Sequence, residues 1–219
     1  MPAASRFLRF RMLLDFTTMD RRTAYFWMAS TIAPRPVAWV STVSADGIAN
    51  LAPFSFFQMI TPHPPTLMIC PQHNGDGSLK DTAQNIQATG EFTVSLVPFA
   101  LVHQMNETSF SFAHGTSEFD AVGVLAAPSS VVAPARVAGS PMSFECRTSG
   151  FTLHPAAQPT CAIILGEVVA AHADESIVGA DGIIDPVKLD LVSRMGADWY
   201  GRTNSLDNFT LPRPAGWAR

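Results

Sequence analysis

Lysine, and charge in general, is scarce in this chain of 219 residues, of which 15% carry a charged side chain. Lys80 and Lys188 are the only lysines, and 14 basic residues face 18 acidic ones, which gives a net charge of -4. A protein that binds nucleic acid non-specifically needs a strongly basic surface. We therefore expect no nucleic-acid partner.

Cysteine is also rare. Cys70, Cys146 and Cys161 form no Cys-x-x-Cys pair, and three scattered cysteines make a poor disulfide framework. This usage favours a reducing compartment, so we expect the protein in the cytoplasm. The six histidines lack the spacing and the acidic neighbours of a metal site, and we expect no metal.

No long apolar run is free of helix breakers. The longest stretch without a charged side chain, 47–75, contains five prolines, so it predicts no membrane-spanning helix, and we expect no membrane partner. The chain has neither a Gly-x-Gly-x-x-Gly motif after a strand nor a Walker loop. Their absence argues against a doubly wound nucleotide fold.

Apolar side chains are abundant enough for one core, since 47% of the residues are hydrophobic. We expect one domain over residues 23–214, with an N-terminal tail at 1–22 and a C-terminal tail at 215–219. Asp46-Gly47 is a hairpin signal. Runs rich in β-formers predict strands at 37–43, from 48 onward, and at 54–60, 66–70, 91–97, 142–148 and 161–172.

Helical spacing is limited to short segments. Leu79, Ala83 and Ile86 predict one helix over 78–89 that ends at Gly90. Residues 101–105 are expected to form a helical turn and 111–127 to be irregular. Many short strands with few helices predict an all-β fold with helical decoration, in the form of a compact antiparallel barrel.

Lys80 stands at the start of the predicted helix, where free backbone N–H groups and the helix dipole favour an anion. One hypothesis is that Lys80 binds a phosphate there. The alternative is that Ser78 or Asp81 caps the helix and that Lys80 is merely solvated.

Arg35 lies between two prolines that hold the backbone extended just before the first strand. It would clamp a phosphate or, equally, pair with a surface carboxylate. Ser41 and Thr42 are adjacent in that strand, so at most one of them faces a given ligand.

Pro53 marks a second candidate region, because proline cannot donate to a central strand ladder and therefore indicates an edge or an irregular joint. The free backbone groups of such a joint, with the small Ala52 and the polar Asn50 and Ser55, match the hydrogen-bonding edge of a flat heteroaromatic ring. The phenylalanines that follow would cover the ring, or they are simply part of the core.

Four motifs follow one another in the order in which they occur in a known family. They are Ala33-Pro34-Arg35-Pro36-Val37-Ala38-Trp39-Val40-Ser41-Thr42, Asn50-Leu51-Ala52-Pro53-Phe54-Ser55-Phe56-Phe57, Lys80-Asp81-Thr82-Ala83-Gln84-Asn85-Ile86 and Ser140-Pro141-Met142-Ser143-Phe144-Glu145-Cys146. With them the chain resembles the flavin reductase-like, FMN-binding split-barrel family, which includes flavoredoxin. The segments 166–168 and 194–200 are similar too, so the resemblance covers residues 25–214.

The resemblance implies a six-stranded antiparallel split barrel of Greek-key type that acts as a homodimer and binds FMN non-covalently. Lys80 and Thr82, with Arg35 and with Ser41 or Thr42, would hold the phosphate. The segment 50–55 would line the isoalloxazine. The cofactor-binding residues implied in this way are Arg35, Ser41, Thr42, Asn50, Leu51, Ala52, Pro53, Ser55, Lys80, Thr82 and Asn85.

The expected function is an oxidoreductase that passes hydride from NADH or NADPH to FMN, and reduced flavin or electrons to a flavin-dependent monooxygenase or another acceptor. The flavin supplies the difficult chemistry, so we name no catalytic acid or base. His114 is the histidine expected to approach the open face of the flavin. The alternative is an FMN-binding electron-transfer or flavin-storage protein without nicotinamide activity, and no motif separates the two.

Overall fold

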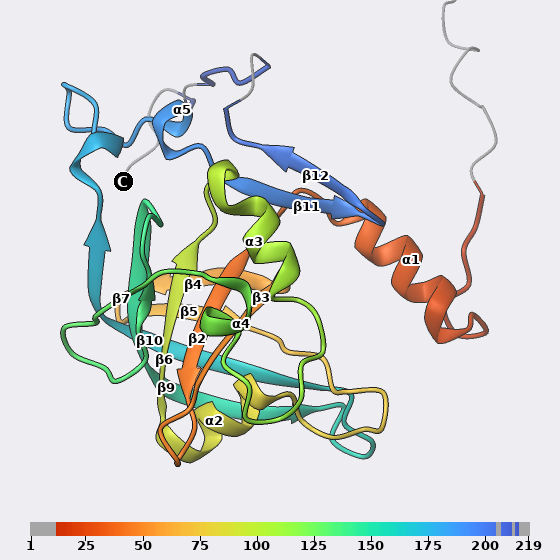
Figure 1. Cartoon of the computed structure of the whole chain (residues 1–219). Coiled ribbons are helices and arrows are strands. Elements are labelled where there is room, and N and C mark those ends of the chain that lie inside the picture. Colours follow the sequence, from red (N-terminus) through yellow and green to blue (C-terminus); the bar gives the residue numbers. More distant parts are fainter. Residues whose placement is uncertain (1–11, 205–206, 212, 215–219) are drawn as a thin grey trace, which may run out of the picture.

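The computed structural model describes residues 12–204, 207–211 and 213–214, and its largest element is a sheet of seven strands. These are β2 (Ala38–Val43), β3 (Ala49–Phe54), β4 (Phe57–Pro62), β5 (Pro65–Ile69), β6 (Glu91–Leu96), β9 (Met142–His154) and β10 (Cys161–Ala173). They lie in the order β3-β2-β6-β9-β10-β5-β4 with antiparallel pairings (Figure 1). The expected all-β class is confirmed.

The two edge strands of this sheet, β3 and β4, are neighbours in sequence. Only Ser55 and Phe56 separate them, so Phe54 and Phe57 lie within about 11 Å of each other. Because both edges meet at this bend, the sheet curls into a barrel that is split there. The strand predicted over 54–60 is wrong in its bounds, and the sheet has seven strands rather than six because the bend divides the run 49–62.

Smaller elements surround the barrel. A second sheet has the order β1-β11-β12, and a third pairs β7 with β8. Helix α2 lies at the end of the barrel away from the β11–β12 hairpin, and helix α1 lies beside that hairpin (Figure 1). The bounds are β1 (Arg35–Pro36), β7 (Ala126–Ala127), β8 (Arg136–Val137), β11 (Val192–Gly196), β12 (Trp199–Arg202), α1 (Arg21–Thr31), α2 (Asp81–Thr89), α3 (Val102–Glu107), α4 (Glu118–Val122), α5 (Pro186–Leu189) and the 3-10 turns Phe99–Leu101 and Glu175–Ile177.

Apolar side chains fill both faces of the barrel wall. Val40, Phe92 and Ile164 belong to a cluster inside the barrel, to which α2 also contributes. Neighbouring residues of a strand point to opposite faces, so Trp39 packs in a second cluster on the outer face, together with Met105 of α3. The two clusters hold α2 at one end of β3 and α3 against its outer side.

Local turn and capping signals are confirmed. The N–H of Ser44 donates to the carbonyl of Ile48 at 2.9 Å and closes the β2–β3 hairpin. Gly90 ends α2 with a φ of +74°, a left-handed conformation that glycine adopts at little cost. The predicted turn at 101–105 is part of α3, and β9 and β10 extend beyond the predicted 142–148 and 161–172.

Three helices were not expected: α1, α4 and the short α5. α1 begins after Asp20, whose carboxylate accepts the N–H groups of Arg22 and Thr23, and Ala29 is its only buried residue. Tyr25, Met28, Ala29 and Ile32 follow helical spacing, but the three large side chains are more than half exposed, so α1 buries little apolar surface against the barrel. α4 lies within 111–127, where the prediction of irregular structure is wrong.

The three cysteines are free thiols, and burial raises the pKa of Cys146 to about 12, as suits an inert core residue. Among the described residues, no helix combines the length and the apolar character needed to cross a membrane. Of the expected tails, residues 1–11 and 215–219 lie outside the described residues, and α1 starts within the expected N-terminal one.

Candidate functional site

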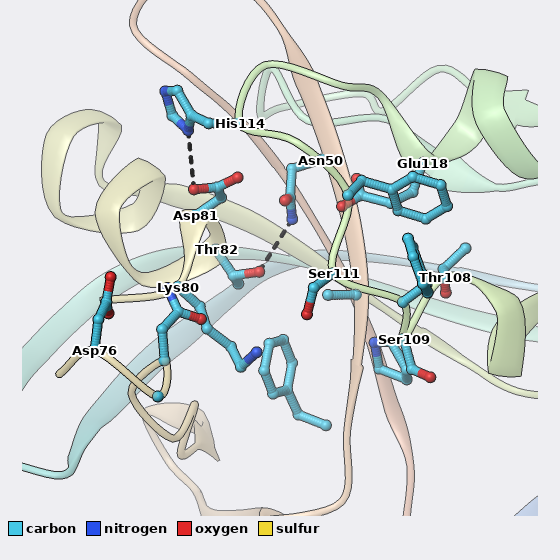
Figure 2. A pocket seen from close by; sticks show the side chains of 17 residues that line it. Asn50, Asp76, Lys80, Asp81, Thr82, Thr108, Ser109, Ser111, His114 and Glu118 are labelled. Atoms are coloured by element: carbon cyan, nitrogen blue, oxygen red, sulfur yellow. Dashed lines mark hydrogen bonds and ion pairs between the residues drawn. The ribbon is translucent and has the colours of Figure 1, made fainter. Parts of the chain in front are cut away.

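A cavity of about 520 Å³ opens between the edge strand β3, the start of α2 and the segment 108–118, and its size is typical of a small-molecule site (Figure 2). It is lined by Asn50, Ala52, Pro53, Phe54, Asn74, Gly75, Asp76, Lys80, Asp81, Thr82, Thr108, Ser109, Phe110, Ser111, Phe112, His114 and Glu118. Five of the eleven implied binding residues meet here: Asn50, Ala52, Pro53, Lys80 and Thr82.

Buried polar side chains fix the start of α2 against the barrel. The amide nitrogen of Asn50 donates to the hydroxyl of Thr82 at 3.0 Å, and that of Asn85 donates to the hydroxyl of Thr42 at 3.0 Å. Thr42 and Asn50 are directly paired across β2 and β3. Thr42 and Asn85 therefore stand behind the cavity wall and position α2, while Asn50 and Thr82 line the cavity itself.

Lys80 is the residue that precedes α2, and its side chain makes no capping bond. Neither Ser78 nor Asp81 caps this helix: Ser78 bonds to Asp76 instead. The first N–H groups of α2 therefore lack a side-chain acceptor and lie at the positive end of the helix dipole. Lys80 extends from this point into the cavity (Figure 2). A cation beside an uncapped helix start is suited to bind a phosphate.

Carboxylates line the same cavity. Asp81 lies 3.0 Å from Nδ1 of His114, which places His114 at the rim of the cavity. Burial raises the pKa of Glu118, although its Oε2 accepts the backbone N–H of Leu51 at 2.8 Å. Hydrogen bonds from Ser78 lower the pKa of Asp76. Lys80 is thus set among acidic groups.

The outer edge of β3 presents backbone carbonyls. In a strand, alternate residues direct both N–H and C=O to the same side. The N–H of Leu51 points outward to Glu118, so the carbonyls of Leu51 and Pro53 point outward as well. The missing N–H of Pro53 falls on this edge, as the sequence predicts. A flat heterocycle with an N–H group would find acceptors here.

Three of the implied residues lie away from this cavity. The guanidinium of Arg35 donates to the carbonyls of Ala29 and Ile32 at the end of α1, where a cation is favoured. Ser41 is buried on the face of β2 opposite to Thr42, and its hydroxyl has no hydrogen-bond partner in the part of the chain that the structure describes. Ser55 lines a neighbouring cavity.

The sequence did not point to Glu118 or to the segment 108–112 as parts of the site. Both lie more than fifty residues from β3 in sequence, and folding alone brings them to it. The one local signal for the helix that carries Glu118 was Ser117, which caps α4 because its hydroxyl accepts the N–H of Asp120. Within the described ranges, no group of three or more His, Cys, Asp or Glu side chains could hold a metal ion.

Comparison with known proteins places this geometry in a family. The model of the "Flavin reductase like domain" matches residues 28–184. The chain belongs to this family. An uncharacterised protein of Deinococcus radiodurans is 37% identical over 208 residues, which are 91% of this chain and 88% of that protein. Family membership makes the chain a flavin-related oxidoreductase.

Solved structures share the fold. Nitrilotriacetate monooxygenase component B from Bacillus cereus is 26% identical with a TM-score of 0.87, and the match covers 93% of this chain and 100% of that one. Flavoredoxin of Desulfovibrio vulgaris is 21% identical with a TM-score of 0.70, over 85% and 94% of the two chains. The expected split-barrel fold of the flavin reductase-like proteins is therefore confirmed.

The residues of this cavity fit a flavin mononucleotide. The uncapped start of α2 and Lys80 suit its phosphate, and the outward carbonyls of Leu51 and Pro53 suit the N–H of its ring. Phe54 and the segment 108–112 supply apolar surface beside them.

Proposed function

We propose that this protein is an FMN-binding flavin reductase, which takes hydride from NADH or NADPH and supplies reduced flavin or electrons to an acceptor. The observation that carries the proposal is one cavity that holds a lysine, an uncapped helix start and a strand edge with free carbonyls. These three features match the phosphate and the ring edge of FMN.

Each group has a separate task in this proposal. Lys80 and the first N–H groups of α2 bind the phosphate, and Asn50 holds Thr82 in place beside it. The carbonyl oxygens of Leu51 and Pro53 orient the ring. The bound flavin would supply the hydride chemistry, so the protein needs to bind and orient rather than to transfer protons itself.

We also propose that the protein works as a homodimer. Apolar side chains of α1 are more than half exposed, and the helix adjoins the residue before β4, since the rings of Tyr25 and Phe56 lie 6.4 Å apart. Exposed neighbours of this kind are usually covered by a partner. The residues concerned are Tyr25, Phe26 and Met28 on α1, Ile32 directly after it, and Met59 and Ile60 on β4.

The dimer is tested by light scattering of Phe26→Asp and Met59→Asp, with Leu125→Asp as the control, because Leu125 is even more exposed but lies next to β7. We expect monomers from the first two variants only. Equal masses for all variants and the parent protein would contradict the use of this surface.

The likeness to a monooxygenase component B supports a flavin-dependent monooxygenase as the acceptor. Such a partner uses reduced flavin that leaves the reductase, so the proposed protein should turn over many equivalents of added FMN. The three free thiols support a cytoplasmic location, which fractionation of the source cells would test.

The decisive experiment is an anaerobic absorbance trace of the FMN-loaded protein, to which NADH and then NADPH are added. Bleaching of the oxidised flavin faster than in a protein-free mixture supports the reductase and identifies its donor. Bound flavin that stays oxidised with both donors would overturn it in favour of an electron carrier or a flavin store. Failure to bind FMN would overturn both functions.

A further inference from the structure

A second cavity, of about 360 Å³, adjoins the first. The two share Pro53 of β3 and Ser109, so a ligand in one lies next to a ligand in the other. Its far wall is the β11–β12 hairpin, which contributes Arg194, Asp198 and Tyr200. Ser55 of the implied flavin-binding set also lines this second cavity, and the segment 194–200 belongs to the family resemblance, but the proposed FMN site gives Arg194 no role.

Arg194 is held ready for a ligand. Its guanidinium carbon lies 4.7 Å from the centre of the Tyr200 ring, and Nη2 donates to the carbonyl of Ala197. Its acidic neighbour, Asp198, is fully exposed, and the closest approach between them is 4.0 Å. An exposed ion pair of this length contributes little. The guanidinium is thus pre-positioned by stacking and has N–H groups to spare.

Basic groups outnumber acidic ones near the second cavity, because Arg194 and Asp198 line it and Arg35 lies on the strand paired with Arg194. Arg194 lies opposite Arg35 in the strand pair β11–β1. Burial of Arg35 lowers its pKa most, and the nearby charge of Arg194 lowers it further. Arg35 is tied to α1 and keeps its positive charge close by. The first cavity, in contrast, is lined by Asp76, Asp81 and Glu118, and its lysine, Lys80, is assigned to the flavin phosphate. An anion beside the flavin ring is therefore favoured on the Arg194 side.

We propose that the second cavity binds the phosphate or carboxylate group of the molecule that exchanges electrons with the flavin, with Arg194 as its hydrogen-bonding partner. This inference rests on the proposed function, since it assigns a site to the co-substrate. Val37, Met105 and Pro53 give the cavity an apolar wall for the organic part of such a molecule. The oxyanion would come from the pyrophosphate of a nicotinamide dinucleotide or from an acidic acceptor.

Steady-state kinetics with Arg194→Met and Arg194→Lys separate these sources. With saturating FMN, we expect Arg194→Met to raise the KM for NADH or NADPH about tenfold or more, and Arg194→Lys to raise it less. The rate with 1-benzyl-1,4-dihydronicotinamide, which carries no phosphate, should not change. An effect confined to a carboxylate-bearing acceptor such as 2-nitrobenzoate would assign the site to the acceptor.

Two further variants show whether the effect is that of a charge. Asp198→Asn removes the competing carboxylate, so it should lower the same KM about twofold. Arg202→Met is the control, because Arg202 also stacks on an aromatic ring, that of Phe99, but it is hydrogen-bonded to Asp190 and does not line the cavity. It should leave the KM unchanged.

The proposal can fail independently of the reductase function. If the parent protein oxidises no dihydronicotinamide, calorimetric titration of pyrophosphate and of benzoate into the FMN-loaded protein replaces the kinetics, and binding that Arg194→Met weakens about tenfold still supports the site. Binding unaffected by Arg194→Met would overturn it. A loss of FMN affinity in Arg194→Met, with an unchanged KM for the co-substrate, would also overturn it, because the cavity would then belong to the flavin.

Discussion

Replacing Lys80 with alanine should weaken FMN binding and leave the fold intact. The Lys80 side chain makes no hydrogen bond or ion pair with any described residue, so its removal breaks no contact of the fold. A cation at a helix start also opposes the dipole, so α2 would be as stable or slightly more stable. A charge-assisted hydrogen bond to phosphate contributes about 1.5–3 kcal/mol, which corresponds to a dissociation constant about 10- to 150-fold higher.

Titration by quenching of flavin fluorescence measures this change, and riboflavin is the matched ligand because it has the same ring without the phosphate. We expect Lys80→Ala to bind riboflavin as the parent protein does. Lys188→Ala, which removes the other lysine of the chain from the short helix α5, should bind both ligands normally. An unchanged FMN affinity, or equal losses for FMN and riboflavin, would refute the assignment of Lys80 to the phosphate.

The remaining predictions concern stability. Burial raises the pKa of Glu145, but backbone N–H groups at 2.6–3.0 Å and His172 outweigh it and lower that pKa to about 2. Because the folded pKa lies below the ordinary value of 4.5, this carboxylate stabilises the fold above pH 4.5 by on the order of 3 kcal/mol, and the contribution disappears as the pH falls towards 2. Glu145→Gln should therefore lose that amount in urea unfolding at neutral pH and flatten the pH dependence; a steep acid transition that persists would contradict this. Gly166→Ala should cost about 1–3 kcal/mol or more, because its Cβ would lie 2.3 Å from the ring of Phe92, and a melting temperature equal to the parent's would be unexpected. Ser41→Ala should be neutral or stabilising by about 1 kcal/mol, since the buried hydroxyl has no partner among the described residues, whereas weaker FMN binding in this variant would return Ser41 to the phosphate site.

Local chemistry predicted much of the framework. Asp46-Gly47 indicates the β2–β3 hairpin and Gly90 the end of α2, because turn and cap conformations depend on a few adjacent residues. The position of Lys80 at the helix start follows from the same pattern. Pro53 indicates an edge strand for a reason that is equally local, namely its missing N–H.

Long-range contacts decided what the sequence could not predict. Arg35 was a phosphate candidate, but its guanidinium donates to the carbonyls of Ala29 and Ile32 at the end of α1, a helix that was not expected. Side chains alternate between the two faces of a strand, so Ser41 and Thr42 point to opposite faces. Only the packing of α2, whose Asn85 bonds to Thr42, decides that Thr42 is the one on the side of the site. Glu118 reaches Leu51 across more than sixty residues, and no local pattern encodes that bond.

The setting of Lys80 gives it more influence on an anion than a lysine on a neutral surface would have. A phosphate at the start of α2 lies near the carboxylates of Asp76 and Asp81, which repel it, and Glu118 lines the same cavity. Attraction then depends on Lys80 and on the uncapped N–H groups of the helix. Since the helix contribution is fixed by the backbone, the charge at position 80 decides whether the cavity attracts or repels the phosphate. This balance would suit the proposed reductase, which binds oxidised flavin and releases it after reduction.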